Sequence, residues 1–230
     1  MRLAILIILM IASSTLEAVI DKDSMLMAVS AGGSYTRDKS YSNNKTKVLR
    51  KQYRPIVELT SWIPLFQTLS LQVHASASLT PIGDQKEDRD LINDRARGES
   101  MLGYIIHEAS FHWNITPALG VYSSSPYESW NSEHKRQMIP MASSLWCYQH
   151  TLKDLYFFRL KYLHMSYHQD KAHFVYGIGI DLGKVQAFGE KNHWGLIYTL
   201  NGRLIRYYRN ASDHLLRKNG EVTASIGLAF

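Results

Sequence analysis

The chain has 230 residues, a single cysteine and a formal net charge of +6. One cysteine excludes an internal disulfide framework and a zinc site built from several cysteines. Outside the N-terminus there is no stretch of about 18 uncharged apolar residues, so the remaining chain has no candidate transmembrane helix. The excess of basic residues favours an anionic partner, either nucleic acid or lipid headgroups.

The N-terminus has the pattern of a secretory signal peptide. Met1-Arg2 give a positive start, Leu3 to Ala12 are uninterrupted apolar residues, Ser13 to Thr15 are small and polar, and Ala18 is a small residue at the expected cleavage point. This apolar run is too short to span a bilayer. We therefore expect residues 1–18 to be a signal peptide read by the Sec pathway, with Ser14 as an alternative cleavage point, and residues 19–230 to form one domain. Export makes a nucleic-acid partner unexpected.

After this segment the hydrophobic pattern has a period of two. From Leu69 to Leu79 the odd positions are apolar and the even positions are polar. The same alternation recurs in 174–182, 194–200 and 222–230. Successive side chains of a strand point to opposite faces, so each segment predicts a strand with one apolar and one polar face.

Three features favour a membrane barrel over a soluble sandwich. The predicted strands reach the roughly 9–11 residues that a tilted membrane-spanning strand needs, and their polar faces carry charges that a dry sandwich core would not accept. Aromatic residues also gather near strand ends, as in the girdles of membrane barrels. These residues are Tyr53, Trp62, Phe66, Tyr104, Trp113, Trp146, Tyr148, Tyr156, Tyr162, Trp194, Tyr207 and Phe230. The predicted fold class is an all-β, antiparallel transmembrane β-barrel.

The pattern divides into ten predicted strands joined alternately by short turns and longer polar links. The strands are 24–36, 47–61, 67–79, 100–112, 115–125, 137–148, 154–167, 172–183, 193–209 and 221–230. Four links are candidate extracellular binding loops: 37–46, 80–99, 126–136 and 210–220. Asn201-Gly202 is a hairpin signal inside the ninth strand, and 184–192 is long for a periplasmic turn. Eight or twelve strands therefore stay open.

The last ten residues carry a resemblance to a protein class. Glu221 to Phe230 alternate and end on phenylalanine. This resembles the C-terminal strand of Gram-negative outer-membrane β-barrel proteins, whose terminal aromatic residue is recognised by the barrel insertion machinery. The resemblance implies a bacterial outer-membrane location, contact with lipid and lipopolysaccharide, and Phe230 as the insertion signal. At eight to ten strands the lumen is narrow and filled by side chains.

His164 and Ser166 form the one local constellation with catalytic character. Two residues apart on a strand, they share a face with Tyr156 and Tyr162, which we expect to look into lipid. A histidine beside a serine can act as its base. The pair resembles the His-x-Ser motif of outer-membrane lipid A 3-O-deacylases and phospholipase A, which implies Ser166 as nucleophile and His164 as base.

The resemblance to these hydrolases is incomplete. Tyr167 stands where those families have an asparagine, and Ile178 stands at the position of the deacylases' orienting glutamate. His164, His168 and His173 have a spacing that a metal could use, but no carboxylate or cysteine completes the set. We expect no metal and no cofactor.

The polar face of the strands supplies charges for the lumen. Arg50, Arg54, Glu58, Arg159 and Lys161 are predicted to point inward and to pair, since an unpaired buried charge is costly. The sequence thus predicts an outer-membrane barrel with a filled lumen and a structural or surface-binding role, which could bind an extracellular ligand through its loops. The alternative is an outer-leaflet lipid ester hydrolase that uses Ser166 and His164.

Overall fold

The computed structural model describes ten ranges of the chain. They are 26–42, 45–66, 68–78, 96–107, 112–124, 137–151, 153–166, 173–188, 194–209 and 214–230. The predicted signal peptide, residues 1–18, lies outside them. Within the described ranges there is no helix long and apolar enough to cross a membrane.

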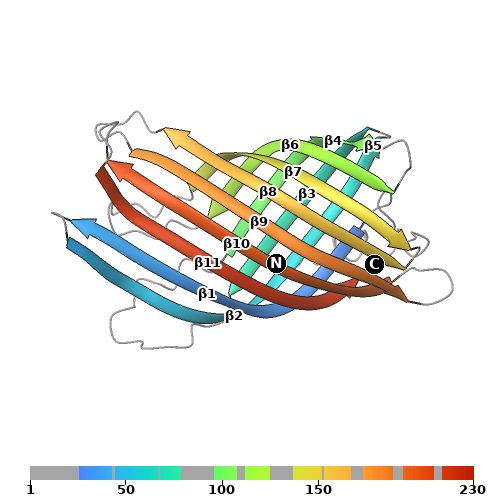
Figure 1. Cartoon of the computed structure of the whole chain (residues 1–230), viewed down its shortest axis with the longest axis horizontal. Helices are drawn as coiled ribbons and strands as arrows, with labels where there is room; N and C mark the ends of the chain where they lie inside the picture. The colour runs from blue at the N-terminus through green and yellow to red at the C-terminus, as the bar shows by residue number, and fades with distance from the viewer. Residues whose placement is uncertain are drawn as a thin grey trace, which may run out of the picture.

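All regular structure in the described ranges is β-strand (Figure 1). The strands are β1 Leu26–Ser42, β2 Lys45–Phe66, β3 Leu69–Ser78, β4 Ala96–Tyr104, β5 Ile106–His107, β6 Trp113–Ser124, β7 Gln137–Thr151, β8 Asp154–Ser166, β9 His173–Phe188, β10 Trp194–Arg209 and β11 His214–Ala229.

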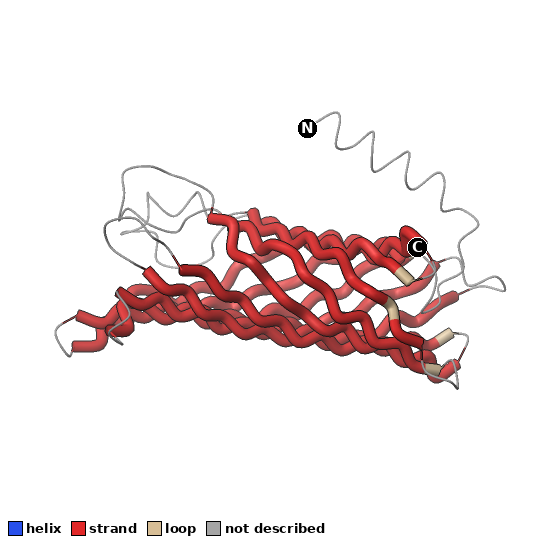
Figure 2. The backbone as a smooth tube through the Cα atoms, turned by 90° about the horizontal axis from the view of Figure 1, so that it is seen from above, coloured by secondary structure: helices blue, strands red, loops and turns tan. Residues whose placement is uncertain are grey.

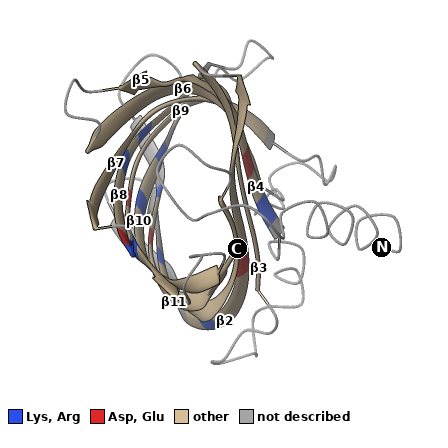
Figure 3. Ribbon diagram, turned by 90° about the vertical axis from the view of Figure 1, so that its right-hand side faces the viewer, with Lys and Arg blue, Asp and Glu red and all other residues tan. Residues whose placement is uncertain are grey.

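The strands close into an antiparallel barrel. Each strand pairs with its neighbours along the chain, and β1 pairs with β11, which joins the two ends of the sheet. β4 and β5 are separated only by Ile105, and both pair with β6, so together they fill one position in the ring. The ring therefore has ten strands, as predicted. Figure 3 views it along the long axis of the barrel. Within the described ranges every strand of the ring has a partner on both sides, which is the condition for a sheet to exist in hydrocarbon, although the part of β2 before Ile56 pairs with β1 alone.

The hairpin signal at Asn201-Gly202 is not a turn. Both residues lie inside β10 and have register partners on both sides, Asn201 with Asp181 and Thr223, and Gly202 with Ile180 and Val222. The Asn201 side chain points into the lumen and donates a hydrogen bond to Glu58 at 3.3 Å, so Asn201 is an inward residue of a continuous strand and not a turn residue. β9 also continues to Phe188, so the link before β10 is only 189–193. These two findings remove the eight- and twelve-strand alternatives.

Two of the predicted loops, 37–46 and 210–220, are largely strand. β1 continues to Ser42 and β2 begins at Lys45, so most of 37–46 belongs to a long β1–β2 hairpin, visible at the left of Figure 1 and in Figure 2. β11 begins at His214, inside 210–220. A third predicted loop, 80–99, is strand only at its end, where β4 begins at Ala96. The predictions were wrong there because backbone pairing continues beyond the region where apolar and polar residues alternate.

The two ends of the barrel differ in their connections. At one end lie Leu26, Phe230 and the links 67–68, 108–112, 152–153 and 189–193; we call it the termini end. At the other lie the links 43–44, 79–95, 125–136, 167–172 and 210–213; we call it the loop end. The two longest links are both at the loop end.

The outer face of the barrel is apolar. Its exposed large residues include Leu119, Ile178, Ile180, Leu200, Val222, Ile226 and Leu228. Aromatic residues join them near the strand ends, among them Phe66, Tyr104, Trp113, Trp146, Tyr156 and Trp194. The polar positions of the same strands are buried inside, as Gln72, Thr116, Thr223 and Ser225 show. Apolar residues outside and polar residues inside reverse the arrangement of a soluble protein.

An apolar cluster fills the lumen towards the termini end. It consists of Leu26, Ala28, Trp62, Leu145, Cys147, Leu155, Phe157, Val185, Ala187, Ile197 and Ala229. Trp62 was predicted for the outer aromatic girdle, which is wrong, because it occupies an inward position of β2 and is 8% exposed. Its ring meets Phe157 edge-on with centroids 4.9 Å apart. Cys147, the single thiol, is buried in this cluster, which we call the apolar plug.

Candidate functional site in the lumen and on the outer face

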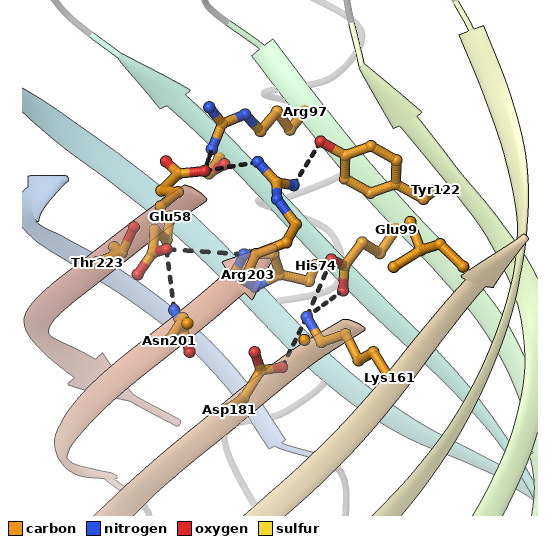
Figure 4. Close-up of a pocket in the computed structure, with 15 residues that line it drawn as sticks. Glu58, His74, Arg97, Glu99, Tyr122, Lys161, Asp181, Asn201, Arg203 and Thr223 are labelled. Carbon is orange, nitrogen blue, oxygen red and sulfur yellow. Dashed lines mark hydrogen bonds and ion pairs between the residues drawn. The ribbon is translucent and has the colours of Figure 1, made fainter. Parts of the chain in front are cut away.

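Charged side chains from six strands, together with His74 from β3, meet in the lumen beyond the apolar plug (Figure 4). Glu221 on β11 is the centre of one group. It accepts hydrogen bonds from Arg97, from Arg203 at 2.5 Å and from the Ser34 hydroxyl at 2.5 Å. Arg203 also donates to the Tyr122 hydroxyl and lies over that ring at 4.8 Å. One carboxylate thus holds two guanidinium groups from opposite sides of the lumen.

Lys161 on β8 is the centre of a second group. Its Nζ donates to both oxygens of Glu99, at 2.7 and 2.9 Å, and lies 2.8 Å from the Asp181 carboxylate. Arg159, two residues earlier on the same inward face, lies 3.7 Å from Asp181. These pairs connect β8 to β4 across the barrel and to its neighbour β9.

Glu58 on β2 is the centre of a third group. The Ser225 hydroxyl donates to it at 2.6 Å and the Asn201 amide at 3.3 Å, while His74 Nε2 lies 3.7 Å away. Glu58 is 3% exposed, so these polar neighbours replace the water that a buried carboxylate would otherwise need.

The three groups together form what we call the ion-pair layer, and they line a cavity of about 40 Å³. A cavity of this size holds a few water molecules and no larger solute. Buried polar atoms without a protein partner in the described chain, such as Nε of Arg159 and of Arg203, are suited to such waters.

The structure confirms most of the predicted lumenal charges. Arg54, Glu58, Arg159 and Lys161 all point inward, whereas the side chain of Arg50 lies outside the described side chains. Sequence reasoning missed their partners. These are His74, Arg97, Glu99, Asp181, Arg203 and Glu221. Each occupies an inward position of its strand, so the period-two pattern contained the signal, but distances across the lumen depend on register and closure.

His164 lies where the sequence predicted, on the outer face of β8. It is exposed, and its ring centroid lies 6.4 Å from that of Tyr162 and 4.9 Å from that of Tyr176. Ser166 is the last residue of β8 and pairs through its backbone with Phe174. The Ser166 side chain lies outside the described side chains.

No carboxylate accompanies His164 in the described parts of β7 to β10. The two carboxylates there are Asp154, at the termini end, and Asp181, which is paired inside the lumen. Within the described residues there is also no group of three metal-ligating side chains. His168 lies outside the described ranges, as does the side chain of His173.

No protein-family model matches the chain, and no curated protein matches it in sequence. Among solved structures, an outer membrane channel from Pseudomonas putida F1 aligns over 93% of this chain and 98% of its own, with 11% identity and a TM-score of 0.46. Ail from Yersinia pestis aligns over 89% and 98%, with 10% identity and a TM-score of 0.32. The outer membrane protein OprG from Pseudomonas aeruginosa aligns over 89% and 94%, with 10% identity and a TM-score of 0.34. The barrel fold is therefore established by the strand pairing within this chain, in which β1 pairs with β11 and closes the ring.

Proposed function

We propose that this chain is an integral β-barrel of a bacterial outer membrane with a closed lumen, serving envelope structure and surface binding. The first support is the outer face. In β10 the outward residues from Leu196 to Leu204 are apolar or aromatic except for Gly202. Such a band would be unstable in water and is stable in hydrocarbon.

The connections support an orientation in this membrane. Outer-membrane barrels have short periplasmic turns and longer extracellular loops. By this rule the termini end faces the periplasm and the loop end faces outward. Phe230 then lies at the periplasmic rim, where we propose that the insertion machinery recognises it.

The observation that carries the closed-lumen proposal is the filling of the interior by two successive barriers. The apolar plug occupies the lumen towards the termini end, and the ion-pair layer crosses it beyond the plug. A hydrated ion would have to displace Trp62 and Phe157 and then separate Lys161 from its two carboxylates. A diffusion pore needs a continuous aqueous path, which these side chains interrupt.

Planar-bilayer recording of the refolded barrel tests this proposal. The native protein is expected to give no discrete conductance steps. A variant with both Trp62→Ala and Phe157→Ala removes the ring pair of the plug and should raise ion leakage. Stable conductance steps from the native barrel would overturn the closed-lumen function.

Surface binding would use the long links at the loop end, 79–95 and 125–136. If cells that express the native chain adhere to an immobilised ligand or to a host surface, replacing either link by a short linker should abolish this adhesion while the barrel still folds. Adhesion that is unchanged when both links are replaced would leave only the structural role.

A second candidate function is hydrolysis of outer-leaflet lipid esters. One observation favours it: His164 is exposed on the outer face, where lipid would reach it. The Ser166 hydroxyl would attack the ester carbonyl and pass its proton to His164, which would protonate the leaving alcohol; water would then release the acyl group from Ser166. Mass spectrometry of lipid A and phospholipids from strains with the native chain or Ser166→Ala tests this, and identical lipid profiles would remove the enzyme function.

A further inference from the structure

One row of register partners crosses the outer face near the loop end. His164 on β8 pairs with Tyr176 on β9, Tyr176 pairs with Arg206 on β10, and Arg206 pairs with Lys218 on β11. These four residues share the outward positions of their strands with the apolar band. The row therefore changes from aromatic to basic along its length.

Two positive charges lie directly opposite each other in this row. Arg206 is exposed and Lys218 is partly exposed, and cross-strand partners have Cβ atoms about 4.5–5.5 Å apart. Like charges at this separation are destabilising. In the described parts of β9 to β11 the carboxylates are Asp181 and Glu221, and both are engaged in the lumen. An anion from outside the chain would relieve the repulsion.

A third positive charge borders the pair across a glycine. Arg37 on β1 is exposed and pairs with Gly220, two residues from Lys218 on β11. A Cβ at Gly220 would make ordinary contacts at 3.9 Å with the Arg37 carbonyl oxygen and Leu204 Cδ1, so Gly220 places no side chain between Arg37 and Leu204 on the outward surface. Arg37, Arg206 and Lys218 form what we call the basic cluster.

The height of the basic cluster matches a membrane boundary. Leu196 and Leu228 are register partners near the termini end, and each lies ten residues from its strand's member of the Arg206–Lys218 pair. Ten residues cover about 33 Å of strand, or about 25 Å along the barrel axis at a tilt of about 40°. This is the height of the apolar band of a membrane barrel, so the cluster lies at the level of outer-leaflet headgroups.

We propose that the basic cluster binds a phosphate group of a phosphorylated glycolipid of the outer leaflet. Arg206 and Lys218 donate charge-assisted hydrogen bonds to the phosphate oxygens, and Arg37 approaches from across Gly220. The acyl chains of the same lipid lie below, against Leu204 and Val222. The inference rests on the membrane location proposed above and adds a ligand and a place for it.

Native mass spectrometry of the full barrel with purified lipid A tests the proposal. The probes are bis-phosphorylated lipid A, the same lipid after removal of its phosphates, phosphatidylglycerol and inorganic phosphate. The native barrel is expected to prefer the bis-phosphorylated lipid over the dephosphorylated one by at least about tenfold, the effect of one or two charge-assisted bonds. In Arg206→Gln/Lys218→Gln this preference should disappear.

Lys153→Gln is the matched control for the single variant Arg206→Gln. Lys153 is an exposed lysine in the turn at the termini end, so the control removes one positive charge far from the cluster. It should keep the native preference, whereas Arg206→Gln should reduce it. Equal binding of all four probes, or equal loss in Lys153→Gln, would overturn the site. Preference for phosphatidylglycerol over lipid A would overturn the glycolipid assignment.

Membrane insertion of the same samples separates the two proposals. If the native barrel enters lipid vesicles and becomes protease-resistant but shows no phosphate preference, only the glycolipid site fails. If it does not enter vesicles at all, the proposed membrane function fails as well.

Discussion

At the scale of single residues, Glu221 is where the largest effect of one side chain is expected. Glu221→Gln keeps the shape but removes the charge that holds Arg97 and Arg203 in the lumen. Both guanidinium groups would then be buried without their carboxylate, which typically costs about 3–5 kcal/mol. Urea unfolding of the refolded barrel in lipid vesicles should show this decrease in the free energy of unfolding.

Ser34→Ala is the control for Glu221→Gln. It removes one neutral donor to the same carboxylate, at 2.5 Å, and leaves both ion pairs in place. The free energy of unfolding should fall by about 1 kcal/mol. Equal losses in the two variants would mean that charge pairing is not what stabilises the ion-pair layer.

Individual lumenal charges could be assigned to a face from sequence, but their partners could not. Arg159 and Lys161 alternate with aromatic residues along one strand, which suffices to place them inside. Glu99 and Lys161 are 62 positions apart, and their contact depends on the register and curvature of the strands β4, β6, β7 and β8, which lie side by side in the ring. Trp62 was misplaced because aromatic character alone does not tell a girdle residue from a plug residue.

At the scale of a strand pair, two glycines of β9 and β10 should respond differently to the same substitution. A Cβ on Gly183 would lie closer than 3.0 Å to the Phe157 ring and to the carbonyl oxygen of Tyr198. Neither group can move without disturbing the plug or the β9–β10 ladder. Gly183→Ala should therefore lower the free energy of unfolding by about 1–3 kcal/mol, as overpacking does, measured by urea unfolding.

Gly202→Ala is the matched control on the neighbouring strand. Nothing lies within 4 Å of a Cβ built there, so we expect a change of less than about 0.5 kcal/mol. A larger loss at Gly202 than at Gly183 would contradict the inward packing of Phe157 against β9.

Strand existence was predictable and strand extent was not. Alternation located all ten strands because each must present apolar residues to the outside. It gave too late a start for β11, since Lys218 and its neighbours are polar on both faces. It gave too short a β9, since the next two outward residues beyond Gly183 are polar while the apolar Val185 and Ala187 face the lumen. Local turn chemistry also misled at Asn201-Gly202, where pairing with β9 and β11 overrides the hairpin preference.

At the scale of the whole molecule, the seam between the first and last strands completes the barrel. The backbone N–H of Phe230 donates to the carbonyl of Met27, and the N–H of Met27 donates to the carbonyl of Phe230, both at 2.8 Å. Phe230→Ala keeps these bonds and removes only the ring. We expect the variant to refold in vitro with near-native stability but to accumulate less folded barrel in cells, measured by heat-dependent gel mobility of membrane fractions.

Deletion of Phe230 separates the two effects. It removes both seam bonds as well as the ring, so it should lower stability in vitro and yield in cells. If Phe230→Ala assembled in cells as well as the native chain, the terminal ring would have no part in insertion.

Closure at ten strands followed from the sequence only in part. Counting alternating segments gave the number, but the choice among eight, ten and twelve depended on whether the hairpin signal at Asn201-Gly202 was a true turn and on how the long link 184–192 was divided. The β1–β11 pairing links residues about two hundred positions apart, such as Ala28 with Ala229, and no local pattern encodes that contact.

The position of Cys147 gives the native chain its own reporter of breathing motions. It is the single thiol of the sequence and is 2% exposed within the apolar plug. A water-soluble maleimide can label it only when the packed side chains of the plug transiently part, so the labelling rate of the unmodified protein measures how often the apolar plug opens.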